Sequence, residues 1–167
     1  MPVILGIDPG SRITGFGVVQ VSDGKIQHVN HGVILLQKAS TFAHRLLELG
    51  LALQEIIAKY KPDQVSVEKI FLGKNPDSAF KLGHARGVVI YEAMRAQVEV
   101  HEYATRVVKQ GVTGSGGASK EEVQIVVARL LNLKAIVRLD ASDALAMAVH
   151  RAFQLQKNTA WVKAIEL

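Results

Sequence analysis

A short apolar run near the start of the chain, V-I-L-G-I at residues 3–7, is the strongest constraint on the fold. A strand with one face in water alternates apolar and polar residues, so this unbroken run predicts a strand that is buried on both faces. Sheets with such strands carry helices on both sides. The chain is therefore predicted to be an α/β protein, and its 167 residues, 49% of them hydrophobic, suffice for a single domain with a real core.

Hydrophobic periodicity and turn signals divide the rest of the chain. The predicted further strands are 13–21, 25–36, 64–68 and 98–101, and the predicted helices are 41–60, 76–97, 103–112, 119–131 and 141–156. Short turns join the first three strands into an antiparallel meander, whereas the later strands need helical crossovers. The order predicts a mixed five-stranded sheet with helices on both faces, in which functional side chains collect at strand ends.

The composition narrows the class of protein. There is no cysteine, so disulfides and thiolate metal sites are excluded. Neither a signal-peptide pattern nor an apolar stretch of about 20 residues is found, and we expect a cytoplasmic protein with no membrane association. Lys plus Arg number 20 against 15 acids, a net charge of +5 that fits a polyanionic partner. The whole chain, 1–167, is predicted to be one domain, with a tail at 153–167 that carries no recognisable motif.

Four carboxylates do not resemble ordinary surface charges. Asp8 ends the first apolar run, Glu68 ends Q-V-S-V, and Asp140 and Asp143 open an apolar helix at a spacing that places both on one face. A charge at the edge of a core is costly unless it is paired or bound to a cation. Mg²⁺ prefers oxygen ligands, and two such ions can activate water and stabilise the leaving oxygen of a phosphodiester.

Each carboxylate also has an ordinary interpretation. Asp8 precedes Pro9-Gly10 and is a good turn starter. Glu68 is a strand-end residue that Lys69 would neutralise, and either Asp140 or Asp143 is a suitable helix cap. The residues alone leave these alternatives open, because the sequence does not show that the four acids converge.

Four blocks of sequence carry a more specific pattern. They are I-L-G-I-D-P-G-S-R-I-T-G-F-G-V-V from residue 4, V-E-K-I-F-L-G-K-N-P-D-S-A-F-K-L-G-H-A-R-G-V from residue 67, A-T-R-V-V-K-Q-G-V-T-G from residue 104 and D-A-S-D-A-L-A-M-A from residue 140. In this order and spacing they resemble the RuvC family of bacterial Holliday junction resolvases, over about residues 3 to 152. The resemblance implies a ribonuclease H-like fold and an endonuclease that cuts four-way DNA junctions in recombination and repair.

The resemblance also assigns roles to residues. It implies that Asp8, Glu68, Asp140 and Asp143 are catalytic and hold two Mg²⁺ ions, for which Mn²⁺ is a possible substitute. It implies a homodimer whose contact involves the helix at about 77–97. The RuvA–RuvB branch-migration complex is implied as a partner.

DNA-binding residues follow in the same way. The resemblance matches Phe71 to a base-stacking aromatic residue and Lys109 and Lys120 to DNA-binding lysines, and Arg12 and Lys74 are candidates to extend the basic track. The ordinary alternatives are a loop phenylalanine that tucks into the core and lysines on a solvated face.

Four glycines and one histidine also carry structural expectations. Gly15 and Gly17 are expected to leave room for a metal ion or a DNA backbone. Gly83 and Gly87 weaken a helix, and close packing against the sheet or a second subunit would offset that cost. His150 is expected to be buried and structural rather than a metal ligand.

Three rival functions differ in chemistry. An actin-like kinase or ATPase also opens with an Asp-x-Gly hairpin, but it needs two such lobes. A ribosomal-RNA-maturing nuclease shares the fold and the acids, and F-L-G-K-N-P-D-S-A at 71–79 argues against it. A junction-binding module without activity is disfavoured because all four acids are present.

Overall fold

The computed structural model describes residues 1–36, 38, 41–69, 75–136 and 138–165. Its strands and helices alternate after an initial run of three strands, as expected from the sequence. The strands are β1 (Val3–Asp8), β2 (Ile13–Ser22), β3 (Lys25–Leu35), β4 (Gln64–Glu68) and β5 (Glu99–Tyr103). The helices are α1 (Phe42–Tyr60), α2 (Pro76–Arg95), α3 (Thr105–Thr113), α4 (Lys120–Leu130) and α5 (Leu139–Ile165).

The strands form one mixed sheet in the order β3-β2-β1-β4-β5. β1, β2 and β3 pair antiparallel, and β4 and β5 lie parallel to β1. The predicted mixed five-stranded sheet is therefore confirmed. Because β1, β4 and β5 point the same way, their carboxyl ends meet at one edge of the sheet.

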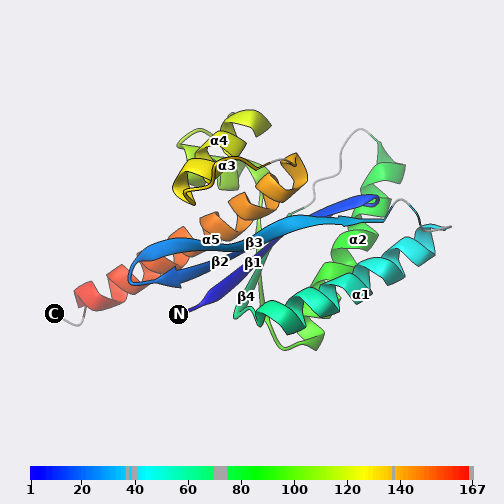
Figure 1. Ribbon diagram of the computed structural model, residues 1–167, viewed down its shortest axis with the longest axis horizontal. Coiled ribbons are helices and arrows are strands. Elements are labelled where there is room, and N and C mark those ends of the chain that lie inside the picture. The colour runs from blue at the N-terminus through cyan, green and yellow to red at the C-terminus, as the bar shows by residue number, and fades with distance from the viewer. Residues whose placement is uncertain (37, 39–40, 70–74, 137, 166–167) are drawn as a thin grey trace.

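Helices cover both faces of the sheet (Figure 1). α5, α3 and α4 lie on one face, and α1 and α2 lie on the other. β1 supplies both cores, because Ile4 packs into the first cluster whereas Leu5 and Ile7 pack into the second, and all three are fully buried. This two-sided burial is the reason that the run has no polar alternation.

α5 lies unusually close to β1 and β2. A Cβ built on Gly6 would lie 2.0 Å from the carbonyl oxygen of Ala144, and one on Gly15 would lie 2.0 Å from that of Asp140. Gly17 faces Leu145 in the same way. The expectation that Gly15 and Gly17 leave room for a metal or DNA is therefore wrong, since the space is filled by the helix.

The start of α5 also differs from the prediction. The helix begins at Leu139 rather than near residue 141, so Asp140 and Asp143 both lie within it and neither is its cap. Its 27 residues also run beyond the predicted end. Among the helices of the described residues, none combines the length and apolar character that crossing a membrane requires.

The other helical layer contains no comparable contact at its glycines. Gly83 and Gly87 lie inside α2, and a Cβ built on either would meet nothing within 4 Å. Packing against the sheet of the same chain is thus excluded as the reason for these glycines. A second subunit is the expectation that is left.

Candidate active site

Two carboxylates meet at the edge of the sheet because their strands are parallel neighbours. Asp8 is the last residue of β1 and Glu68 is the last residue of β4. The chain turns sharply after Asp8, and the Thr14 hydroxyl stabilises that turn by accepting from the Gly10 N–H and donating to the Gly10 carbonyl. The turn and the strand-end position of Asp8 are thus both present, and the turn does not use the Asp8 side chain in either bond.

A hollow of about 120 Å³ lies at this edge, between the strand ends and helices α3, α4 and α5. It brings together three of the four predicted acids and both predicted lysines. Its lining residues are Asp8, Glu68, Thr105, Val108, Lys109, Lys120, Val123, Asp143, Ala146 and Met147. We call this hollow the acidic pocket.

Asp140 lies beside the acidic pocket and does not line it. Its carboxylate is 3.9 Å from the Arg138 guanidinium, and its backbone carbonyl lies against Gly15 on β2. Its charge nevertheless acts on Asp8. The structure therefore places all four acids in one electrostatic neighbourhood, with Asp140 at its margin.

Asp8 is the most perturbed group of the set. Burial, followed by the charges of Asp143 and Glu68, raises the pKa of the Asp8 carboxyl to about 8. Asp140 adds to this rise, and Lys120 opposes it. Desolvation and like charges both penalise an ionised carboxyl, so at neutral pH Asp8 favours its proton unless a cation compensates.

The two lysines of the pocket are already engaged. Lys120 Nζ donates to Asp143 Oδ2 at 2.6 Å, and this hydrogen bond is the main cause that raises the pKa of Lys120. Lys109 Nζ donates to the carbonyl of Ala118 at 2.7 Å, which ties α3 to the loop before α4. The capping box of Ser119 and Glu122 begins α4 as predicted and sets Lys120 at the rim.

Thr105 is a pocket residue that the sequence analysis missed. Its hydroxyl donates to the Glu68 carboxylate, so Glu68 is held by Thr105 rather than by Lys69. The signal lay in the sheet register, because Glu68 pairs with Tyr103 and Thr105 follows two residues later. On the other side, Arg86 Nε donates to the Glu68 carbonyl at 2.9 Å and anchors the strand end to α2.

The donor set fits a divalent cation by its chemistry. Partly buried carboxylate oxygens with excess negative charge are ligands that Mg²⁺ and Mn²⁺ prefer. Within the ranges that the structure describes, no three Asp, Glu, His or Cys side chains converge closely enough to hold an ion as they stand. Asp143 is turned to Lys120, so this contact must rearrange before an ion can bind, whereas Thr105 donates to Glu68 Oε1 and leaves Oε2 to act as a ligand.

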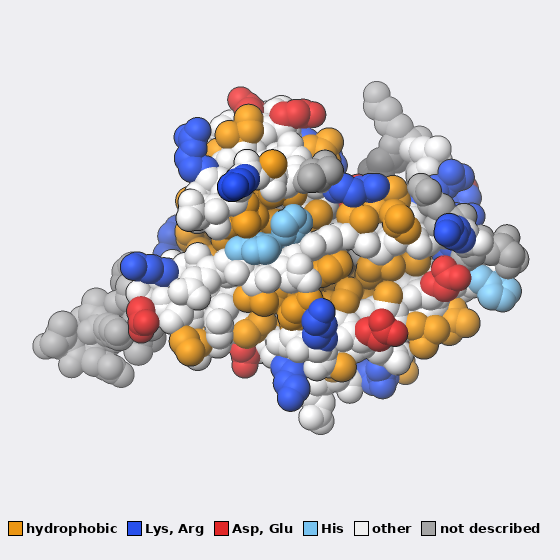
Figure 2. All heavy atoms as spheres, in the orientation of Figure 1, with side chains coloured by type: hydrophobic (Ala, Val, Ile, Leu, Met, Phe, Trp, Pro, Cys, Tyr) orange, Lys and Arg blue, Asp and Glu red, His pale blue; other side chains and the backbone are white. Residues whose placement is uncertain are grey.

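Of the other three predicted DNA-binding residues, the structure describes only Arg12. Phe71 and Lys74 lie outside the described residues. Arg12 is exposed in the turn between β1 and β2 and does not line the acidic pocket. On the face shown in Figure 2, Lys and Arg side chains are scattered and do not form one continuous basic patch.

Comparisons with known proteins agree on one family. The family model described as crossover junction endodeoxyribonuclease RuvC matches residues 4–151. The protein named crossover junction endodeoxyribonuclease RuvC from Bdellovibrio bacteriovorus is 62% identical over 165 residues, which cover 99% of this chain and 98% of that relative.

Solved structures give the same result. The structure of Thermus thermophilus RuvC matches with a TM-score of 0.85 at 34% identity, over 94% of this chain and 97% of that one. T. thermophilus RuvC in complex with its Holliday junction substrate matches with a TM-score of 0.87 at 34% identity, over 95% and 98%. The mixed sheet with helices on both faces is thus the RuvC form of the ribonuclease H-like fold, and the chain belongs to the RuvC family of crossover junction endodeoxyribonucleases.

Proposed function

We propose that this protein resolves Holliday junctions by divalent-metal-dependent hydrolysis of DNA phosphodiesters, in recombination and repair. The observation that carries the proposal is the acidic pocket, in which three acids and two lysines meet at the end of the sheet. A polyanion needs cationic contacts and its hydrolysis needs an oxygen-rich metal site, and this pocket offers both chemistries together.

Asp8, Glu68, Asp140 and Asp143 are the residues that would hold two Mg²⁺ ions, with Mn²⁺ as a substitute. When bound, such ions supply positive charge to the phosphate oxygens and lower the pKa of water. Asp8 carries the raised pKa of this pocket and must give up its proton to bind a cation, so metal binding and deprotonation of Asp8 are coupled.

Lys120 is suited to hold the scissile phosphate. Lys120 forms its bond to Asp143 at the rim of the pocket, where an arriving phosphate competes for the same ammonium. Transfer of Lys120 from Asp143 to phosphate would free the carboxylate at the moment at which substrate arrives. Lys109 keeps α3 and the loop before α4 in place around this exchange.

The Asp8→Asn variant tests the proposal. We expect it to lose cleavage of a four-way junction by about 10³-fold or more in Mg²⁺, because a ligand of the metal site is lost, while junction binding is kept. Glu55→Gln, which removes an exposed acid on α1 on the opposite side of the sheet, is the matched control and should cleave normally.

Four-way junction, linear duplex and structured RNA are compared as substrates in the same assay. Wild-type cleavage rates for Asp8→Asn would contradict the metal site. Preferential cleavage of the RNA would favour the ribosomal-RNA-maturing activity instead.

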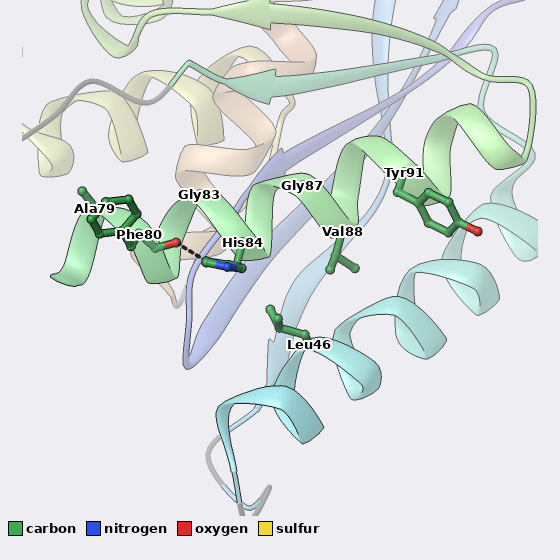
Figure 3. A pocket seen from close by; sticks show the side chains of 8 residues that line it. All are labelled: Leu46, Ala79, Phe80, Gly83, His84, Gly87, Val88 and Tyr91. Atoms are coloured by element: carbon green, nitrogen blue, oxygen red, sulfur yellow. Dashed lines mark hydrogen bonds between the residues drawn. The ribbon is translucent and has the colours of Figure 1, made fainter. Parts of the chain in front are cut away.

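Resolution of a four-way junction takes two cuts, one in each of two strands, and each cut needs an active site. A second copy of the chain would supply the second active site. A groove of about 650 Å³ runs between α1 and α2, on the side of the sheet away from α5 (Figure 3). Phe80 and Tyr91 border it and are 66% and 63% exposed. Apolar side chains so exposed mark an interaction surface, and the open space at Gly83 and Gly87 admits another backbone.

A homodimer through α2 is therefore part of the proposal. Phe80→Asp should shift the protein from dimer to monomer in light scattering at micromolar concentration, whereas Ile125→Asp on exposed α4 should not. An unchanged dimer in Phe80→Asp would place the contact elsewhere. Interaction with RuvA–RuvB and a cytoplasmic location remain predictions from the sequence.

A further inference from the structure

A second hollow lies on the other side of α3 from the acidic pocket. Thr105, Val108 and Lys109 face the acidic pocket, whereas the opposite side of α3 faces a hollow of about 770 Å³. Its lining residues are Ala104, Arg106, Val107, Gln110, Gly111, His150, Gln154 and Lys157. A smaller hollow continues it and shares Gly111, His150, Gln154 and Lys157. We call the two together the outer hollow.

The outer hollow carries positive charge and no acid. Arg106 and Lys157 are exposed, and neither forms a salt bridge within the part of the chain that the structure describes. The first turn of α3 also contributes, because Ala104 at the N-cap provides no side-chain hydrogen bond and the turn contains no acidic residue. Free N–H groups at a helix start attract anions.

His150 supplies an independent indication of a ligand. Its side chain is 2% exposed, and neither ring nitrogen has a hydrogen-bond partner among the described residues. Leaving a buried polar group unpaired ordinarily costs about 1–3 kcal/mol, so the arrangement needs a reason.

Tyr103 and Gly111 pack closely against the His150 ring. The ring packs edge-on to Tyr103 with centroids 4.6 Å apart, and a Cβ at position 111 would lie 2.2 Å from its Nδ1. Only glycine at 111 lets α3 approach the ring. Burial, then the charges of Lys157 and Arg151, lower the pKa of His150, so the neutral ring keeps one N–H to donate.

We propose that the outer hollow binds a phosphate group, either of a DNA arm of the junction or of free inorganic phosphate. The phosphate would accept from the His150 ring and from the start of α3, and Arg106 and Lys157 would neutralise it. A dianion matches the two unpaired cations, and its oxygens match the unsatisfied ring donor.

The DNA form of this inference rests on the proposed function. A strand in the acidic pocket and a phosphate in the outer hollow would grip α3 from its two sides, about 10 Å apart across one helix. The junction arm would then be held by a contact that is separate from the cleavage site. The phosphate site itself requires no cleavage activity.

Nitrogen-15 NMR of the histidine rings tests the site directly on the full chain. Inorganic phosphate should shift the His150 ring signals saturably, and Arg106→Gln and Lys157→Gln should each weaken binding at least threefold. Lys59→Gln, which removes one exposed positive charge on the other side of the sheet, is the control and should bind as the wild type does. His150 signals that stay still with both phosphate and a four-way junction would overturn the proposal.

Junction binding without divalent metal separates the two sources of phosphate. If DNA occupies the site, the Arg106→Gln/Lys157→Gln double variant should lower the slope of log affinity against log salt by about 1, with the cleavage rate of bound junction unchanged. A phosphate-induced shift with an unchanged salt slope assigns the site to the free anion. A wild-type protein that binds phosphate but does not cleave junctions would refute the proposed function and leave this site standing.

Discussion

The two faces of the sheet use glycine in opposite ways. On the α5 face, Gly6 and Gly15 bring a helix backbone within contact of the strands, and added side chains would collide with it. On the α1–α2 face, Gly83 and Gly87 border open space. The first face is closed by its own chain and holds the acids in place, whereas the second face is left open to another molecule.

This difference separates the chemistry from the assembly. The acids need partners at fixed positions, because Lys120 compensates the charge of Asp143 and Thr105 donates a hydrogen bond to Glu68. The open groove requires only shape and apolar surface. Variants on each face should accordingly fail in different ways, and four of them test this division.

The largest effect is expected from removing the charge at the centre of the closed face. The folded-state pKa of Asp8, about 8, is raised above its ordinary value of 3.8, so wild-type protein without metal loses stability as the pH rises from about 4 to 8. Asp8→Asn lacks this loss. Above pH 8 without metal the variant should be more stable by an amount on the order of a few kcal/mol.

Urea unfolding at pH 5 and pH 8.5 with a chelator measures the difference. Near pH 4 the two proteins should differ little, since Asp8 is neutral in the folded chain and only about half ionised in the unfolded chain. Mg²⁺ should restore wild-type stability at high pH and leave Asp8→Asn unchanged. A difference that does not grow with pH would show that Asp8 is not held in its neutral form.

Gly15→Ala disrupts the packing of the closed face by a steric clash. Its new Cβ would meet the Asp140 carbonyl at 2.0 Å, so the start of α5 must move away from β2. We expect a loss of about 1–3 kcal/mol in the free energy of unfolding and a matching loss of cleavage, because Asp140 and Asp143 move with the helix. Unfolding and cleavage are measured on the same preparation. A variant as stable as the wild type would contradict the close contact between Gly15 and the start of α5.

The sequence predicted the part of this arrangement that depends on local pattern. The unbroken apolar run predicted the two-sided burial of β1, and Asp8 and Glu68 stood out as candidate metal ligands because each ends an apolar strand. Gly15 was misinterpreted because its neighbour, Asp140, lies 125 residues away and the crossing of α5 over β2 is a tertiary feature. Thr105 was missed because its relation to Glu68 depends on the register of β4 and β5. His150, by contrast, was correctly predicted to be buried.

Thr105→Val tests a single contact of the closed face, the hydrogen bond from Thr105 to Glu68, and should have a smaller effect. Valine keeps the shape and removes the hydroxyl that donates to Glu68. Loss of a hydrogen bond that orients a metal ligand should raise the Mg²⁺ concentration for half-maximal cleavage by about tenfold. Metal-induced thermal stabilisation should weaken in parallel, and Thr105→Ser should restore both. If valine bound metal as threonine does, Thr105 would have no positioning role.

Gly87→Ala should have the smallest effect and distinguishes the open face from the closed one. Nothing lies within 4 Å of the new methyl group, and alanine favours a helix interior over glycine by up to about 1 kcal/mol. The free energy of unfolding, measured at concentrations at which the protein is monomeric, should therefore rise by up to that amount, whereas Gly15→Ala lowers it. The same methyl group enters the groove, so the dimer should dissociate at higher protein concentration if another backbone approaches α2 there. A stabilised monomer with an unchanged dimer would show that the partner contacts the groove through side chains such as Phe80 and Tyr91 instead.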